Sequence, residues 1–425
     1  MNTDFLARSL PGPDDITRAV LPNGIVVLTR PNFNSPSVVI GGYLTAGSLF
    51  DPPEKLGLAD FTALALMRGT EKYSFQQLYD LLESNAASLG FSGGTHTAGF
   101  SGHALAEDLP LLLSLTAEAL IRPVFPAAEI ERLRAQLLTR LAIRAQDTAD
   151  MASLTFDQIV FDGHPYALPE DGWPETIQAI SLDDLRTFHA AHYGPQGMVL
   201  AIVGAVDPKH AIAEAEKYLG QWHAPRQVPP PDLPPLKPLT RTVQRKVNIP
   251  GKSQSDIVIG SAGPSRKAND YLAASLANSV LGQFGLGGRI GDTVREKSGL
   301  AYYAYSNLSA GTGPGAWTVS AGVNPKNVAK TIDLIRSEIH RFLHDGITPE
   351  ELDDSQSNFV GRLPLSLESN SGIMNALLNI ERYDLGLDYY RRYPTLVRSV
   401  TLEEAVETAR RYLDADKLAI AVAGP

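Results

Sequence analysis

The sequence predicts an α+β protein made of two related domains, and three observations support this prediction. Strands and helices are mixed without a strict βα alternation, which favours layered α+β domains over a parallel sheet. A proline-dense stretch, QWHAPRQVPPPDLPPLKP from Gln221 to Pro238, can continue neither a helix nor a central strand. The two halves also end in similar patterns, so we interpret the chain as a duplicated domain, although such endings are common enough to arise by chance.

Length and composition restrict the class of protein. The chain has 425 residues, of which 44% are apolar and 20% charged, as expected of a globular protein with two large domains. The formal net charge of -10 disfavours binding to nucleic acid phosphates. The sequence contains no cysteine, which excludes disulfides, thiolate zinc sites and a cysteine nucleophile. Any bound metal would therefore need His, Asp or Glu ligands.

The sequence shows no membrane or targeting segment. The N-terminus MNTDFLARSLPGPDD lacks a cationic stretch followed by an apolar run. Nowhere do about 18 uninterrupted apolar residues occur, which is the length needed to span a bilayer as a helix. We therefore expect a cytoplasmic protein, while noting that a removed signal peptide would leave no trace.

The first half contains a strand pair and several helices. GIVVLTR and SVVIGGYLTAG are predicted to be the strands of a hairpin-like pair, and LGLADFTALALMRG is a predicted helix that ends at Gly69. DLPLLLSLTAEALI is a predicted helix, and AAEIERLRAQLLTRLAIRAQD is a predicted long amphipathic helix.

The second half repeats this mixture after the proline-rich stretch. SDIVIGSA, LAYYAYSN and AWTVSAGV are predicted strands, and DYLAASLANSVLG is a predicted helix before a glycine-rich loop. Further helices are predicted from about Lys326 to Asp345 and from Pro349 to Ser366. We expect domains at 1–220 and 240–425, joined by a linker at 221–239.

The similar endings are SLDDLRTFHAAHYGPQGMVLAIVGAVDP before the linker and TLEEAVETARRYLDADKLAIAVAGP at the C-terminus. Each begins with a Ser or Thr N-cap followed by acidic residues in the first turn. A helix then ends near a tyrosine, and an apolar strand runs into glycine.

Two segments resemble catalytic or binding motifs, but their sequence context or spacing does not fit those functions. GFSGG at 90–94 matches the G-x-S-x-G pattern, but a nucleophile elbow needs a helix after Ser92, and the strand-like TAGFSGH follows instead. GLGGRIG near residue 285 lacks the spacing of a dinucleotide-binding loop and the Lys-Ser/Thr of a phosphate loop. An independent serine hydrolase remains only a remote alternative.

The histidines also have plain structural interpretations. His340 and His344 lie one helical turn apart, as zinc ligands often do, but no third ligand is evident, so we interpret them as surface residues. His189 and His192 lie at a predicted helix end, where a cation would suit the helix dipole. His164 lies in a turn-rich loop and is interpreted as structural.

The segment GSLFDPPEKLGLADFTALALMRGT resembles the zinc-helix region of the M16 (pitrilysin) peptidase family, roughly GSR-E-x-x-x-x-GLAHxxEHMxFKGT. In that pattern HxxEH supplies two histidine ligands and a glutamate that activates the metal-bound water. Aligned on GLA and on the terminal GT, the three positions are Asp60, Ala63 and Leu64. The third family ligand, a glutamate some 75 residues further on, falls on Arg140 in IERLRAQLLTRL.

This alignment implies that the chain has lost its metal chemistry, because alanine and leucine have no lone pair to offer and a guanidinium repels a divalent cation. We hypothesise that Asp60 and Arg140 form a salt bridge where the metal would lie, since a lone buried charge would be costly. The alternative is that each side chain faces solvent separately. We expect no metal ligand and no cofactor in this chain.

A second segment, GGRIGDTVREKSGLAYYAYS, resembles the family pattern VREKRGLAYSVYS in the C-terminal domain. Its arginine and the tyrosine seven residues later are Arg295 and Tyr302 in this chain. The resemblance implies that they contact the substrate carbonyl and the developing oxyanion, for which a guanidinium and a phenol are suitable donors. Without it, Arg295 would be an ordinary helix-end residue and Tyr302 part of a half-buried strand.

Other segments resemble M16 landmarks in order, so the resemblance extends over nearly the whole chain. It implies a LuxS-like metallopeptidase fold of two related α+β domains, each a mainly antiparallel sheet covered by helices. In the small bacterial two-subunit branch, one chain carries HxxEH and its partner carries the arginine and tyrosine. The resemblance therefore implies a non-catalytic subunit, with zinc in an HxxEH-containing partner and a peptide as substrate. The competing hypothesis is an architectural or peptide-holding subunit without a role in proteolysis.

Overall fold

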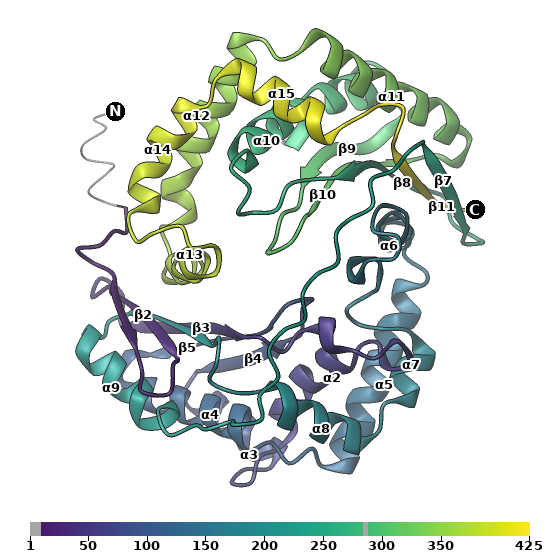
Figure 1. Cartoon of the computed structure of the whole chain (residues 1–425). Coiled ribbons are helices and arrows are strands. Elements are labelled where there is room, and N and C mark those ends of the chain that lie inside the picture. Colours follow the sequence, from purple (N-terminus) through teal and green to yellow (C-terminus); the bar gives the residue numbers. More distant parts are fainter. Residues whose placement is uncertain (1–9, 284–287) are drawn as a thin grey trace. The chain divides into compact units, whose positions relative to one another are not determined.

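The computed structural model describes residues 10–283 and 288–425, and the chain forms two compact units (Figure 1). Unit 1 combines residues up to Leu141 with two later segments, Pro169–Asp232 and Leu363–Arg391. Unit 2 combines Ala142–Leu168, Leu233–Arg362 and Arg392–Pro425.

Unit 1 contains a six-stranded sheet in the order β1-β2-β6-β3-β5-β4. All neighbours are antiparallel except β2 and β6, which are parallel. The strands are β1 (Thr17–Val20), β2 (Val26–Pro31), β3 (Ser37–Leu44), β4 (Ser88–Ser92), β5 (Ala98–Leu105) and β6 (Val199–Gly204).

Helices surround this sheet and share its hydrophobic core. Helix α4 is apolar on most of its surface, with eight buried side chains, and it packs against both β5 and α9. The helices are α2 (Leu58–Ala65), α3 (Phe75–Ser84), α4 (Leu109–Ile121), α5 (Ala127–Arg144), α7 (Pro174–Ala179), α8 (Leu182–His192), α9 (Pro208–Leu219) and α13 (Asn370–Tyr383). The core of Unit 1 therefore lies between the sheet and α2, α4, α5, α8 and α9.

Unit 2 contains a five-stranded sheet in the order β7-β11-β8-β10-β9. The strands are β7 (Val243–Asn248), β8 (Ser255–Ala262), β9 (Ala301–Leu308), β10 (Ala316–Val323) and β11 (Ala419–Gly424). Its neighbours are antiparallel except for the parallel pair β7 and β11.

The helices of Unit 2 include two π-helical turns, which bracket the glycine-rich stretch. They are η6 (Ser279–Gln283) and η8 (Gly291–Glu296). The α-helices are α6 (Thr148–Val160), α10 (Tyr271–Asn278), α11 (Val328–Asp345), α12 (Pro349–Ser366), α14 (Tyr389–Ser399) and α15 (Leu402–Tyr412). Three limits between the units fall inside α5, α12 and α14, and the other two, after Leu168 and after Asp232, lie between elements.

Apart from the additional edge strand β1 of Unit 1, the two sheets have the same topology, as expected from a duplication. In each, the last strand of a sequence half lies between a parallel and an antiparallel neighbour: β6 between β2 and β3, and β11 between β7 and β8. These two strands are the apolar strands within the similar sequence endings. The predicted class, α+β with two mainly antiparallel sheets and covering helices, is confirmed.

In each unit, one helix that covers the sheet comes from the other half of the sequence; we call α13 and α6 the borrowed helices. All six residues of β6 and of β11 are buried, so each of these strands needs cover on both faces of its sheet. Helix α13, from the second half, packs on β3 and β6, and helix α6, from the first half, packs on β8 and β11. The compact units are therefore interleaved along the sequence, whereas the predicted domains 1–220 and 240–425 follow the two halves.

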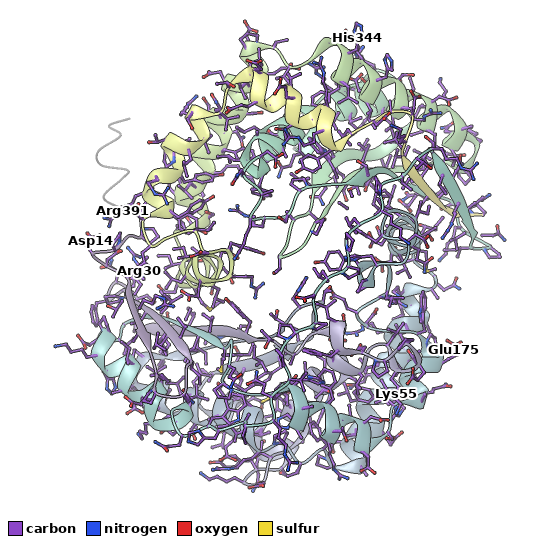
Figure 2. The ribbon with its side chains drawn as sticks, in the orientation of Figure 1. Asp14, Arg30, Lys55, Glu175, His344 and Arg391 are labelled. Carbon is purple, nitrogen blue, oxygen red and sulfur yellow. The ribbon has the colours of Figure 1, made fainter. Side chains whose placement is uncertain are left out.

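Ion pairs fix the borrowed segment to the start of the chain in Unit 1. Arg18 Nε and Nη2 donate to the two carboxylate oxygens of Glu381 on α13, at 2.9 and 2.7 Å. Arg391 and Asp14 form an ion pair of 2.5 Å beside Arg30, and the three lie together in Figure 2. These contacts add specificity to the apolar packing of α13.

Most predicted elements are present. The two strands predicted as a hairpin-like pair correspond to β2 and β3, but the pairing is wrong, because β6 lies between them in the sheet. The apolar helix corresponds to α2, which continues as a 3₁₀ turn to Arg68 before Gly69. The helix predicted from Asp270 is shorter, because α10 changes to the π-helical η6 at Ser279. Part of the glycine-rich loop near residue 285 lies outside the described residues, at 284–287. Among the described residues, no helix is both long and apolar enough to cross a membrane.

Candidate functional site

Helix α2 carries three of the four positions at which the family pattern places its metal chemistry. The helix begins after Gly57, which has a left-handed φ of 93° that favours glycine. The carboxylate of Asp51 accepts hydrogen bonds from the backbone N–H groups of Gly57 and Ala59, at 2.8 and 2.9 Å. Asp51 therefore caps the helix from an earlier loop and satisfies two donors at its N-terminus.

Asp60 and Arg140 form the salt bridge that the sequence predicts. Arg140 Nη2 on α5 lies 2.6 Å from Asp60 Oδ2, and the backbone N–H of Gly93 donates to Asp60 Oδ1 at 3.1 Å. The Asp60 side chain is 12% exposed and the Arg140 side chain 47% exposed. The hypothesis is confirmed, and the two aligned positions are neighbours in space although 80 residues separate them in sequence.

Burial dominates the electrostatics of Asp60. Desolvation raises the pKa of its carboxyl, and it outweighs the opposing effects of the bond to Arg140 and the Gly93 N–H. Burial likewise raises the pKa of Asp51 to about 7, against the hydrogen bonds from the backbone N–H groups of Gly57, Leu58 and Ala59. The position corresponding to the metal thus holds the Asp60 carboxylate, whose charge is costly to bury, and the Arg140 guanidinium, which partly offsets that cost.

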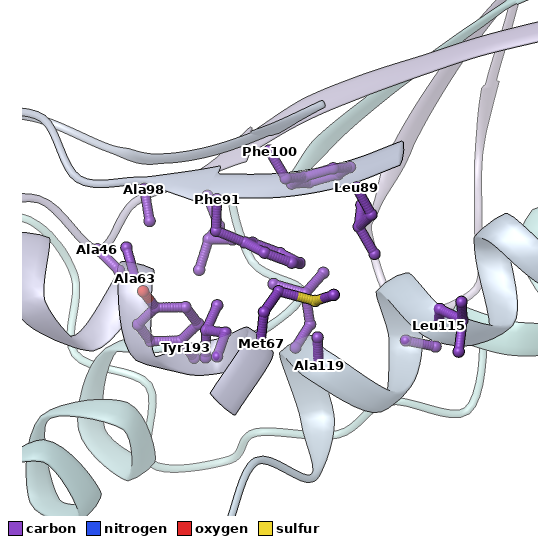
Figure 3. Packing of buried hydrophobic residues seen from close by; sticks show 14 of the residues in the cluster. Ala46, Ala63, Met67, Leu89, Phe91, Ala98, Phe100, Leu115, Ala119 and Tyr193 are labelled. Atoms are coloured by element: carbon purple, nitrogen blue, oxygen red, sulfur yellow. The ribbon is translucent and has the colours of Figure 1, made fainter. Parts of the chain in front are cut away.

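The other two aligned positions of the metal-binding motif, Ala63 and Leu64, are part of the apolar core. Ala63 is fully buried, and Leu64 is partly buried against the same core. Figure 3 shows Ala63 with Ala46 and Tyr193 in this packed cluster. The Tyr193 hydroxyl is buried and has no hydrogen-bond partner within the described residues. Burial, with a contribution from the charge of Asp60, raises the pKa of Tyr193.

These residues do not fit a zinc ion. Zinc needs three or four N, S or O donors in tetrahedral geometry, whereas this position offers one paired carboxylate. The adjacent guanidinium would repel the cation. Within residues 10–283 and 288–425, no group of three or more His, Cys, Asp or Glu side chains could hold a metal.

Arg295 and Tyr302 lie in Unit 2, on consecutive elements of the chain. Arg295 is in the last turn of η8, where its Nε lies 3.6 Å from Glu296 Oε1 and its side chain is 44% exposed. Tyr302 is the second residue of β9 and is 83% exposed. Asp292, the other acidic neighbour of Arg295, instead pairs with Lys297 at 2.5 Å. Both side chains thus present polar donors to solvent from one short stretch of chain.

The sequence motifs that we rejected have structural roles. Ser92 ends strand β4 and is followed by strand β5 rather than by a helix, so no nucleophile elbow forms. His340 and His344 stack in parallel on α11 with ring centroids 6.2 Å apart, and His344, labelled in Figure 2, pairs with Asp345. His164 is buried in its turn and accepts a hydrogen bond from the Tyr166 backbone.

The expectation that His189 and His192 serve as cations at a helix end is wrong. Burial lowers the pKa of both, which favours their neutral forms. His189 Nε2 lies 2.8 Å from the carbonyl oxygen of Leu120, and the ring of His192 stacks on Phe50 at 4.0 Å. Both histidines therefore act as packing residues between α8 and its neighbours.

Sequence reasoning missed three residues around these positions. Asp51 could have been found from its place before a Gly-initiated helix, where acidic residues are favoured. Tyr193, and the buried Asp256 of β8, which accepts a hydrogen bond from the Tyr303 hydroxyl, have no sequence signal of their own, because their roles depend on contacts between distant segments.

Comparison with known proteins agrees with this geometry. Residues 26–165 match the family described as "Insulinase (Peptidase family M16)", and residues 179–359 match "Peptidase M16 inactive domain". Together the two matches span more than half of the chain. The chain belongs to the M16 peptidase family.

Individual relatives are similar over nearly their whole length. An uncharacterized zinc protease of Mycobacterium tuberculosis is 28% identical over 96% of this chain and 93% of its own. A non-peptidase homolog from Helicobacter pylori is 26% identical over 88% of this chain and 86% of its own. The crystal structure of a peptidase M16 inactive domain from Pseudomonas fluorescens superposes with a TM-score of 0.90, at 26% identity, covering 97% of this chain and 98% of that one.

Proposed function

We propose that this chain is the non-catalytic subunit of a two-subunit M16 zinc peptidase, and that it supplies Arg295 and Tyr302 to the zinc site of an HxxEH-containing partner. The proposal rests on one contrast. The metal position is closed by the Asp60–Arg140 pair, whereas the arginine and tyrosine of the family pattern are present and accessible. The similarity to a non-peptidase homolog and to an M16 inactive domain supports the first half of this contrast.

The chemistry of the two donors suits peptide-bond hydrolysis at a metal in another subunit. Attack of a zinc-activated water on a peptide carbonyl places negative charge on the carbonyl oxygen. A guanidinium and a phenol hydroxyl can each donate a hydrogen bond to that oxygen and to the substrate backbone. Removing one such donor from an active site typically costs about 100-fold to 1,000-fold in kcat.

The test is reconstitution with a partner. The chain would be co-expressed with an M16 chain of similar size, encoded beside it, that carries an intact HxxEH motif, and the purified complex would be assayed on a fluorogenic peptide library. We expect peptidase activity from the pair and none from this chain alone. Arg295→Ala should lower kcat/KM about 100-fold or more while the complex stays intact by size-exclusion chromatography.

Matched surface variants control for indirect effects. Lys297→Ala removes a neighbouring exposed cation, and Tyr305→Phe removes a phenol hydroxyl from the same strand. Both should leave activity within about twofold, as expected of surface changes away from the reacting atoms. A fully active pair carrying both Arg295→Ala and Tyr302→Phe would refute the proposal and favour an architectural subunit. Zinc-dependent proteolysis by this chain alone would also refute it.

A further inference from the structure

Strand β9 contains an irregularity at Tyr302, one of the two residues on which the proposed function depends. The register with β10 pairs Tyr303 with Gly322 but Ala301 with Val323, so Tyr302 is an extra residue without a partner on β10. Such a β-bulge re-aims the side chain of the inserted residue. Ala304 and Ser306 are buried on the covered face of the sheet, and strict alternation would place Tyr302 with them. It is instead 83% exposed.

The neighbouring Tyr303 holds the strand at this bulge. Its hydroxyl donates a hydrogen bond to Oδ1 of Asp256, which lies on β8, beyond the intervening strand β10. Asp256 is 2% exposed and also receives hydrogen bonds from Gln254 Nε2 and the Thr148 hydroxyl. Because Thr148 is the first residue of α6, the Asp256 carboxylate also lies near the positive end of that helix.

Gly322 makes this contact possible. A Cβ at Gly322 would lie 2.5 Å from Tyr303 Cε1, 2.7 Å from Gln254 Nε2 and 3.1 Å from Asp256 Oδ1. The Tyr303 ring therefore crosses β10 where a side chain is absent, in the manner of an aromatic residue covering a strand glycine. Any other residue at 322 would push the ring away from Asp256.

We propose that Tyr303, Gly322 and Asp256 form a positioning device that fixes the β-bulge and thereby aims Tyr302 outward for substrate. This inference rests on the proposed function, because it concerns the orientation of a residue that acts only there. Misplacement of a reacting group by about 1 Å can cost about 100-fold in rate. The loss from releasing the bulge through Tyr303→Phe is expected to be about 10-fold in kcat/KM, since the ring itself remains.

A double-mutant cycle in the reconstituted complex tests the device. Tyr303→Phe should lower kcat/KM about 10-fold when Tyr302 is present and have no further effect in a Tyr302→Phe background, because positioning matters only if there is a hydroxyl to position. Tyr305→Phe, on the same face of β9, is the matched control. Equal losses from Tyr303→Phe in both backgrounds would overturn the inference.

A second measurement uses the isolated chain and needs no activity. With 3-fluorotyrosine incorporated at position 302, the 19F resonance should shift or split in Tyr303→Phe and in Gly322→Ala, but not in Tyr305→Phe. An unchanged resonance in Tyr303→Phe would overturn the inference even if Gly322→Ala failed to fold. If the wild-type pair showed no peptidase activity, the proposed function would fail, while the 19F comparison would still decide the positioning role.

Discussion

Replacing Arg140 by methionine tests whether the ion pair at the metal position stabilises Unit 1. Methionine keeps a similar aliphatic length but leaves the Asp60 carboxylate with only the Gly93 N–H. Breaking a fully buried pair costs about 3–5 kcal/mol, and an exposed pair contributes about 0–1 kcal/mol. Since the Asp60 side chain is 12% exposed but that of Arg140 is 47% exposed, we expect a loss of about 2 kcal/mol.

The loss of stability caused by Arg140→Met should be larger at neutral pH than at acidic pH. The pKa of Asp60 is already raised by burial in the native state, and removing Arg140 raises it further. A carboxyl with a raised native pKa binds more protons when folded than when unfolded, so its contribution to stability falls as pH rises. The cost of Arg140→Met should therefore be full near pH 7.5 and shrink toward pH values near 3.8, the ordinary pKa of an aspartic acid, where the buried carboxyl is protonated.

Urea unfolding followed by tryptophan fluorescence at about pH 4.5 and about pH 7.5 measures this difference. Asp60→Asn removes the titrating group, so Arg140→Met should cost much less in that background. Arg186→Met is the control, because its ion pair with Asp183 is exposed on both sides and should contribute under about 0.5 kcal/mol. A cost for Arg140→Met that stays the same at both pH values would refute the reasoning.

Two further predictions concern the borrowed helix and the helix cap. Leu377 of α13 is fully buried, so Leu377→Ala should lower the free energy of unfolding by about 2–5 kcal/mol, with hydrogen exchange accelerated in β3 and β6 more than in β8 and β11. Burial raises the pKa of Asp51 from its ordinary value of 3.8 to about 7, so its contribution to stability should decline as pH rises between these values. Asp51→Asn should flatten the dependence of the melting temperature over that range, and an unchanged slope would contradict this assignment.

Local patterns were sufficient to predict most of the fold. Hydrophobic periodicity, N-caps and terminal glycines locate β2, β3, α2 and α11, because these signals come from residues within one or two turns of each other. The exchange of α6 and α13 between the sequence halves was not predictable in this way. Each helix is amphipathic or apolar whichever sheet it covers, and the choice of sheet depends on the burial of both faces of β6 and β11.

In the candidate site, too, one feature was predictable from the sequence and another was not. The Asp60–Arg140 contact was predictable because the family alignment brings two distant positions together, and opposite charges at both make a pair favourable. The bulge at Tyr302 was not predictable, because nothing in LAYYAYSN distinguishes a strand with an inserted residue from a regular strand. Its cause, a glycine on β10 and a carboxylate on β8, lies in two other segments of the chain.

The residues at the former metal position affect the stability of the fold, whereas the arginine and tyrosine of the second family pattern affect it little. Asp60 and Ala63 lie in the packed interior of Unit 1, so their identities are constrained by the stability of the fold whatever the chain does. Arg295 and Tyr302 are exposed, and side chains of that kind contribute little to folding. An exposed tyrosine held out by a buried hydrogen-bond network gains nothing for stability from its orientation. The physical argument for the proposed function is therefore strongest at Tyr302, which is 83% exposed at an irregularity of β9.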